Sequence, residues 1–153
     1  MSKFNGRDVC IEVPDDWQDR TIIAFAAPLK PKQTVAPNIV MTRDSIGANE
    51  PASAYADKQL VELAKRLESF NLSSKQDITL GGLPAVELVF TWRGGNGILK
   101  QKQIFVAPGN GLVITFVATA LVSDFSGMEP VFGAILDTVG FPSAKGAANS
   151  QVQ

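Results

Sequence analysis

The clearest pattern of apolar and polar positions lies in residues 80–121. Three apolar runs there are separated by two glycine-rich breaks, GGNG at residues 94–97 and PGNG at residues 108–111. Glycine and asparagine tolerate the positive φ of tight hairpin turns, so the breaks predict an antiparallel meander. Apolar residues occur on both faces of the predicted strands, whereas a sheet with one solvated face alternates cleanly. The pattern therefore predicts a sheet that is covered on both sides.

Shorter apolar runs before the meander predict four further strands, over residues 9–13, 21–27, 38–42 and 75–80. In the third of these strands Asn38 and Thr42 share a face with Val40. Two polar side chains around an apolar one fit either a solvated edge or the lining of a site that needs hydrogen bonds.

Apolar residues at helical spacing predict two amphipathic helices, over residues 51–70 and about 123–139. Gln59 lies at the margin of the first apolar stripe. Ser123 or Ser126 is expected to cap the second helix, and Ser126 has the spacing of a capping box with a glutamate three residues later.

These elements predict an α+β fold of two layers, in which both helices cover one face of a twisted antiparallel sheet. One domain is expected over residues 1–143, and the small, polar residues 144–153 are expected to be disordered. The other face of the sheet would expose apolar side chains, among them those of Ile22, Ala24, Val40 and Leu99. A contiguous apolar surface usually serves binding. The alternative is that loops or sheet curvature close this face.

One strand of the meander sharpens this expectation, because Leu99, Gln101 and Gln103 share one of its faces. Glutamine offers donors and an acceptor without charge, so it suits a groove that meets a partner's polar groups within an apolar site. A solvated face would explain the two glutamines equally well from sequence alone.

Composition narrows the classes of partner. The 153 residues carry a net charge of −1, with 45% hydrophobic and 19% charged residues, which is typical of a soluble globular protein. A chain so close to neutrality is not expected to bind nucleic acid. No run approaches the roughly 20 apolar residues of a membrane span, and the first residues lack the apolar run of a signal peptide. We therefore expect a cytoplasmic location without stable membrane insertion.

The residue types present also restrict the kinds of catalytic and metal-binding site that the chain can form. Histidine is absent and Cys10 is the only cysteine, which excludes Cys/His zinc sites, Ser-His-Asp triads and Cys-His dyads. The carboxylates of the predicted strands stand singly, so no general acid–base pair is indicated. Neither glycine-rich break precedes a helix as a phosphate-binding loop does. We expect no enzyme, no cofactor and no metal site.

The block VPDDWQDRTI at residues 13–22 resembles the DcrB-related (DUF1795) family, and within it the Eag chaperones of type VI secretion. The resemblance continues in the same order along nearly the whole domain, at Phe25, Pro28, Thr42, Arg43, Asp44, Tyr55, Gln59, Leu60, Asp77, Ile78, Trp92, Gln103 and Phe105.

This resemblance implies a Mog1/PsbP-like fold that works as a homodimer in the bacterial cytoplasm. Such chaperones shield the N-terminal transmembrane helices of a PAAR- or Rhs-type effector before it is loaded on the secretion spike. The implied groove residues are Ile22, Ala24, Asn38, Val40, Thr42, Gln59 and Gln103. Their apolar side chains would replace lipid around the client helix, and their polar groups would imitate the hydrogen bonds between membrane helices.

At two positions the sequence departs from the pattern of the family that it resembles, and both positions affect how a client helix would fit. Ala24 is smaller than the bulky aliphatic residue expected there, and Asn38 replaces a small hydroxyl residue. The alternatives are a generic Mog1-like module that binds a folded partner, and a DcrB-like envelope protein.

Overall fold

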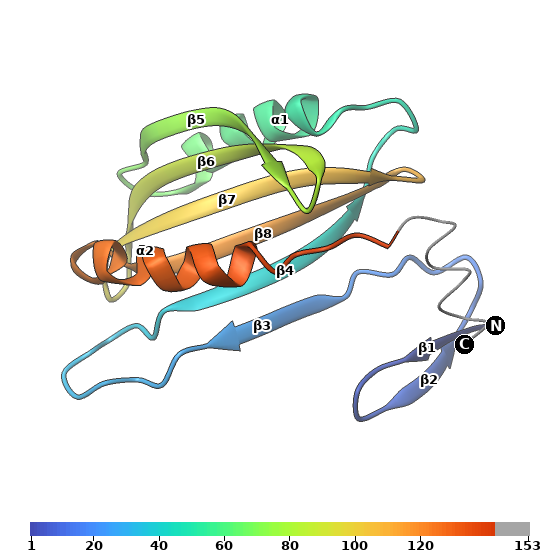
Figure 1. Ribbon diagram of the computed structural model, residues 1–153, viewed down its shortest axis with the longest axis horizontal. Coiled ribbons are helices and arrows are strands. Elements are labelled where there is room, and N and C mark those ends of the chain that lie inside the picture. Colours follow the sequence, from blue (N-terminus) through green and yellow to red (C-terminus); the bar gives the residue numbers. More distant parts are fainter. Residues whose placement is uncertain (143–153) are drawn as a thin grey trace.

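The computed structural model describes residues 1–142, which form eight strands and two helices (Figure 1). In chain order these are β1 (Ser2–Asn5), β2 (Cys10–Val13), β3 (Ile22–Ala26), β4 (Asn38–Ser45), α1 (Ala52–Arg66), β5 (Asn71–Leu80), β6 (Leu83–Gly94), β7 (Gly97–Gly109), β8 (Leu112–Leu121) and α2 (Val122–Leu136). The predicted disorder of residues 144–153 lies outside the described residues, and the single domain over residues 1–143 stays a prediction.

Six strands form one antiparallel sheet in the order β3-β4-β8-β7-β6-β5. The meander β6-β7-β8 lies where the pattern predicts it, and its turns use backbone that favours glycine, with φ of 130° at Gly97 and 121° at Gly109. The hairpin β3-β4 joins the sheet because β4 pairs with β8. The sequence did not predict β1, which pairs with β2 in a separate two-stranded sheet.

The two helices pack on opposite faces of the sheet. On β7, Phe105 points to α1 and belongs to a core cluster with Ala56 and Leu63 of that helix. Its neighbours Ile104 and Val106 point the other way, into a cluster with Leu136 at the end of α2. Figure 1 shows the sheet lying between α1 and α2. The α+β class and the antiparallel sheet are confirmed. The placement of both helices on one face is wrong, because the meander is apolar on both faces and each face receives its own helix.

Helix α1 is shorter than predicted. It ends at Arg66 because Leu67 adopts an extended conformation (φ −89°, ψ 131°), and Ser69 then takes a positive φ of 55°. Phe70 still reaches the core from the following segment, with its ring centroid 5.0 Å from that of Phe90.

Helix α2 starts directly after β8, without a connecting loop. Leu121 occupies the N-cap position and no side chain caps the helix, so the predicted serine cap is wrong. Phe125 and Phe132 are buried against Ile39, Ala118 and Ala120 of the sheet. Ile135 of the same helix is 46% exposed.

Candidate functional site

Helix α1 covers only part of its face of the sheet. It packs on β6 and β7 and leaves β3, β4 and β8 without a helix on that side. We call the uncovered area the open face. It consists of the side chains that point to the α1 side from β3, from residues 38–42 of β4, from residues 115–121 of β8 and from the first half of β7: Ile22, Ala24, Ala26, Asn38, Val40, Thr42, Thr115, Val117, Thr119, Leu121, Leu99, Gln101 and Gln103.

Strand register arranges these side chains in rows across the sheet. In the central row Ala24 lies opposite Val40, Val40 opposite Val117, and Val117 opposite Gln103. Directly paired residues of an antiparallel sheet point to the same side and touch. Every strand residue that the sequence proposed for the site therefore lies on this one face.

Gln59 belongs to α1 rather than to the sheet. It is half-buried and lies one helical turn after Tyr55, on the same side of the helix. Tyr55 reaches across to β4, where its hydroxyl donates to Asp44 Oδ2 at 3.1 Å. Gln59 therefore borders the open face, as its marginal place on the apolar stripe predicts.

A short hydrogen-bond chain runs along the open face. Gln103 Nε2 donates to Gln101 Oε1 at 3.4 Å, and Gln101 Nε2 donates to Thr119 Oγ1 at 3.0 Å. Among the hydrogen bonds within residues 1–142, Gln103 Oε1 accepts none. Asn38 donates instead to the backbone oxygen of Ala36 at 3.0 Å. Gln103 thus has acceptor capacity left for a partner on this face.

The open face is also uncharged. None of these residues is ionisable; the nearest charge on the same side of β4 is that of Asp44, beyond Thr42 at one end of the face. The lysines of β7 alternate with its glutamines and point to the α2 side. Its apolar members are accessible, since Ile22 is 68% exposed and Val40 and Val117 are half-buried, whereas Thr115 and Thr119 are buried. An accessible apolar surface without charge favours an apolar partner over a charged one.

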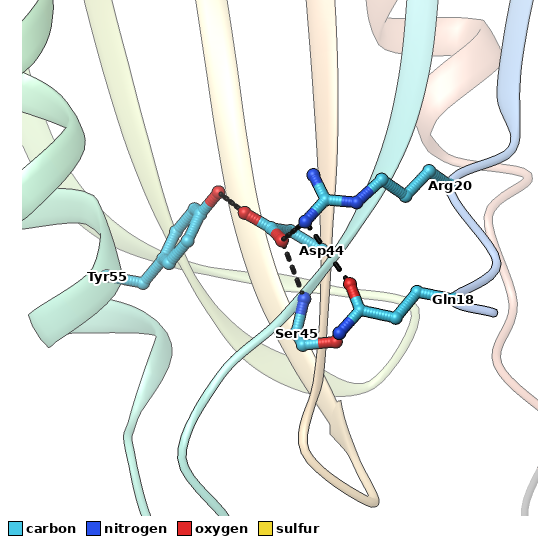
Figure 2. Close-up of polar contacts among 5 residues, drawn as sticks. All are labelled: Gln18, Arg20, Asp44, Ser45 and Tyr55. Atoms are coloured by element: carbon cyan, nitrogen blue, oxygen red, sulfur yellow. Dashed lines mark hydrogen bonds and ion pairs between the residues drawn. The ribbon is translucent and has the colours of Figure 1, made fainter. Parts of the chain in front are cut away.

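One end of the open face is closed by a polar cluster centred on Asp44 (Figure 2). Asp44 Oδ1 accepts from Ser45 N at 2.8 Å and lies 3.8 Å from the guanidinium of Arg20, which donates to Gln18 Oε1 at 3.2 Å. Together with the Tyr55 hydrogen bond, these contacts tie α1 to β4 and to the segment before β3. Burial, and then the charge of Asp44, raise the pKa of Tyr55 to about 12.

The four open-face residues of β8 were missed by the sequence reasoning: Thr115, Val117, Thr119 and Leu121. The first three are flanked by β4 on one side and β7 on the other, in the middle of the face. The alternation T-x-V-x-T-x-L at residues 115–121 was the available signal. Its meaning depends on the pairing of β8 with β4, which no local pattern reveals.

The open face is a surface rather than a cavity. Two pockets lie beside it or away from it: one of about 640 Å³ between the β1-β2 hairpin and residues 17–22, which borders the open face at Ile22, and one of about 440 Å³ beside the start of α1. Within residues 1–142, no three or more Cys, Asp or Glu residues gather as a metal site would require. No helix of the described chain is long and apolar enough to cross a membrane. The arrangement suits an elongated partner that lies across strands.

Comparison with known proteins places the fold in a family. Residues 8–138 match the DcrB family. The chain belongs to the DcrB family. The resemblance found in the sequence is thereby confirmed. This DcrB-family chain is also 28% identical over 139 residues to Effector EagT6 of Pseudomonas aeruginosa, and the match covers 91% of the chain and 95% of that protein.

Solved structures agree with this placement. Protein PA94 of Pseudomonas aeruginosa, whose function is unknown, matches the DcrB-family chain with a TM-score of 0.77 at 27% identity, over 91% of the chain and 95% of PA94. LpqN of Mycobacterium tuberculosis, which is involved in cell envelope biogenesis, matches with a TM-score of 0.58 at 24% identity, over 84% and 79% of the two chains. The likeness to LpqN shows a shared fold alone.

Proposed function

We propose that this chain is a chaperone of type VI secretion that holds the apolar N-terminal helices of an effector on its open face. The observation that carries the proposal is the uncharged, accessible surface beside α1, in which Gln103 keeps a free acceptor. The similarity to Effector EagT6 supports the assignment to type VI secretion.

The dimensions of the open face suit a helix. Four neighbouring strands, β3, β4, β8 and β7, are spaced about 4.8 Å apart and span roughly 15 Å. A helix with its side chains is about 10–12 Å wide. One apolar helix can therefore lie against α1 and cover the rows that contain Val40, Val117 and Gln103.

The mixture of side chains supports the same client. Val40 and Val117 offer apolar contacts in place of lipid, and Asn38 and Gln103 offer the amide groups that pair with Ser, Thr or Gln between membrane helices. The site residues are Ile22, Ala24, Asn38, Val40, Thr42, Gln59, Leu99, Gln101 and Gln103, joined by Thr115, Val117 and Thr119. The chain acts by binding and not by catalysis, in the cytoplasm and as a homodimer, on a PAAR- or Rhs-type effector.

Co-expression with the N-terminal helices of the effector encoded beside its gene tests the proposal. The effector fragment is expected to stay soluble only when the chain is present, and to be lost with the double variant Ile22→Asp, Gln103→Ala. Ile135→Asp is the matched control, since Ile135 is exposed on α2 and lies on the other side of the sheet. A fragment that is soluble alone, or that the double variant still holds, contradicts the proposal. Binding of a folded domain that lacks apolar helices, insensitive to these substitutions, would favour a generic interaction module.

A further inference from the structure

The β1-β2 hairpin has one apolar face and stands apart from the six-stranded sheet. Its two strands form a sheet of their own, and Figure 1 shows the hairpin set off from the larger sheet, beyond the start of β3. Phe4 lies directly opposite Ile11, and Val13 shares their side of the hairpin, while Lys3 and Glu12 point the other way. A two-stranded hairpin alone is marginally stable in water. Its apolar face is therefore expected to pack against a partner.

A pocket of about 640 Å³ lies between this apolar face and the segment that leads into β3. Its apolar walls come from both sides: Phe4, Ile11 and Val13 of the hairpin, and Trp17 and Ile22 of the segment. Polar side chains complete the lining: Ser2, Lys3, Gln18, Asp19, Arg20 and Thr21. Apolar walls with a small number of polar groups are the usual composition of a ligand pocket, and the volume is in the usual range. The pocket suits a side chain with an apolar body and a polar tip.

The pocket continues the open face at one of its ends. Ile22 lines the pocket and is also a member of the open face on β3. Arg20 lines the pocket too, and its guanidinium lies 3.8 Å from Asp44, in the polar cluster that closes this end of the face (Figure 2). An apolar helix on the open face thus meets, at this end, apolar walls with amide and charged groups among them.

We propose that this pocket binds a tryptophan or tyrosine side chain from one end of the client helix. The proposal rests on the proposed function, because it takes the open face as the place where that helix lies. Tryptophan and tyrosine are enriched at both ends of transmembrane helices, where the ring is in an apolar environment and its N–H or O–H group is in a polar one. The open face and the pocket offer these environments in the same order, with the uncharged surface along the helix and the mixed pocket at its end.

The polar groups of the pocket fit the two aromatic residues. The oxygen atoms of Gln18 and Asp19 are hydrogen-bond acceptors among its lining, and the indole N–H and the phenol O–H are donors. The ring packs between Ile11, which is 50% exposed, and Trp17, which is 66% exposed. The hairpin thereby gains the partner that its apolar face requires, and the client helix is enclosed between α1 on one side and the hairpin on the other.

Anisotropy titrations with two labelled apolar helices, both flanked by lysines, test the pocket. One helix carries leucine at both ends of its apolar segment, and the other carries tryptophan there. The unmodified chain is expected to bind the tryptophan helix about 3- to 10-fold more tightly, which corresponds to the contribution of one aromatic contact. Ile11→Ser and Trp17→Ala are each expected to remove this preference. Neither residue belongs to the open face, so the affinity for the leucine helix is expected to change by less than about 2-fold.

Val9→Ser is the matched control for Ile11→Ser. Val9 belongs to the same hairpin and is 56% exposed, but it does not line the pocket. This variant is expected to keep the preference for tryptophan. Because Trp17 lies outside the two strands of the hairpin, Trp17→Ala tests the pocket even if Ile11→Ser disturbs the hairpin itself.

Photocrosslinking locates the aromatic ring independently. Benzoylphenylalanine replaces the tryptophan at one end of the helix or at the other, and mass spectrometry identifies the residues to which it links. One of these two placements is expected to link to residues 2–22 of the chain. Benzoylphenylalanine at the centre of the helix is expected to link to β4, β8 or β7.

Equal affinity of the unmodified chain for both helices, or a preference that survives both Ile11→Ser and Trp17→Ala, overturns the inference. Crosslinks from both ends that avoid residues 2–22 also overturn it, and this is the result expected if another part of the chain or a second copy fills the pocket. The leucine helix reports on the open face alone. A chain that binds neither helix therefore contradicts the proposed function as well, whereas a chain that binds both equally contradicts only the assignment of the pocket.

Discussion

Truncation of Ile22 gives the most direct measure of what the open face contributes to binding. Ile22 is 68% exposed in the free chain and stands at the end of its row, so Ile22→Ala removes little that the fold depends on. The free energy of unfolding in urea is expected to change by less than about 0.5 kcal/mol.

The expected cost to binding follows from the exposed fraction. Full burial of an isoleucine side chain contributes roughly 1.5–3 kcal/mol. About two-thirds of Ile22 remains to be buried by a client, which gives roughly 1–2 kcal/mol and a Kd weakened about 5- to 30-fold.

Fluorescence anisotropy measures this change with a labelled apolar helix, flanked by lysines that keep it monomeric in water. Ile135→Ala is the matched control, because Ile135 is 46% exposed on α2, on the other side of the sheet. The mass of each variant is checked so that altered self-association does not account for the effect. Equal losses for both variants, or an unchanged Kd for Ile22→Ala, would refute the reasoning.

Three further predictions concern polarity, core packing and pH. Gln103→Leu is expected to leave the midpoint of unfolding in urea unchanged or higher. In anisotropy titrations, the same variant is expected to lose about 2- to 10-fold more affinity for a helix with a central serine than for an all-leucine helix. Phe90→Ala empties a site that is 0% exposed and is expected to reduce the free energy of unfolding in urea by about 3–5 kcal/mol. Tyr55 has a folded pKa of about 12 against an ordinary 10.0, so its contribution to stability is complete below pH 10 and is lost as the pH rises to 12. In the Tyr55→Phe variant the free energy of unfolding, measured in urea, is therefore expected to fall less between pH 10 and pH 12 than in the unmodified chain. An identical fall in both proteins would contradict this prediction.

Local patterns were sufficient for most of the elements. The glycine-rich breaks located the meander because each break needs backbone conformations that few residues adopt. The apolar stripe located α1 within a few residues of its ends. The start of α2 was close to its predicted place, but its cap was wrong, because the helix continues β8 without a loop and both candidate serines lie inside it. β1 was missed because SKFN has neither alternation nor enrichment in strand-forming residues.

Tertiary arrangement was harder to predict, since it depends on pairings between distant segments. Alternation correctly placed Val40 on the same face of its strand as Asn38 and Thr42, and Gln103 on the face that carries Leu99. It could not show that β8 lies between their strands, and so it missed Val117. For the same reason it assigned both helices to one face, although the two apolar faces of β7 require one helix each.

The alternating KQKQ of β7 has a consequence for folding fidelity. Lys102 lies 3.9 Å from Glu87 on the α2 side, where both side chains are largely buried, while Gln101 and Gln103 point to the α1 side. A slip of β7 by one residue would reverse every side chain. It would place Lys100 and Lys102 among the apolar residues of the α1 side and leave Glu87 without its cation. A misregistered β7 is therefore strongly disfavoured. Residues 100–103, which keep their lysines off the open face, also fix the register of β7 that forms this face.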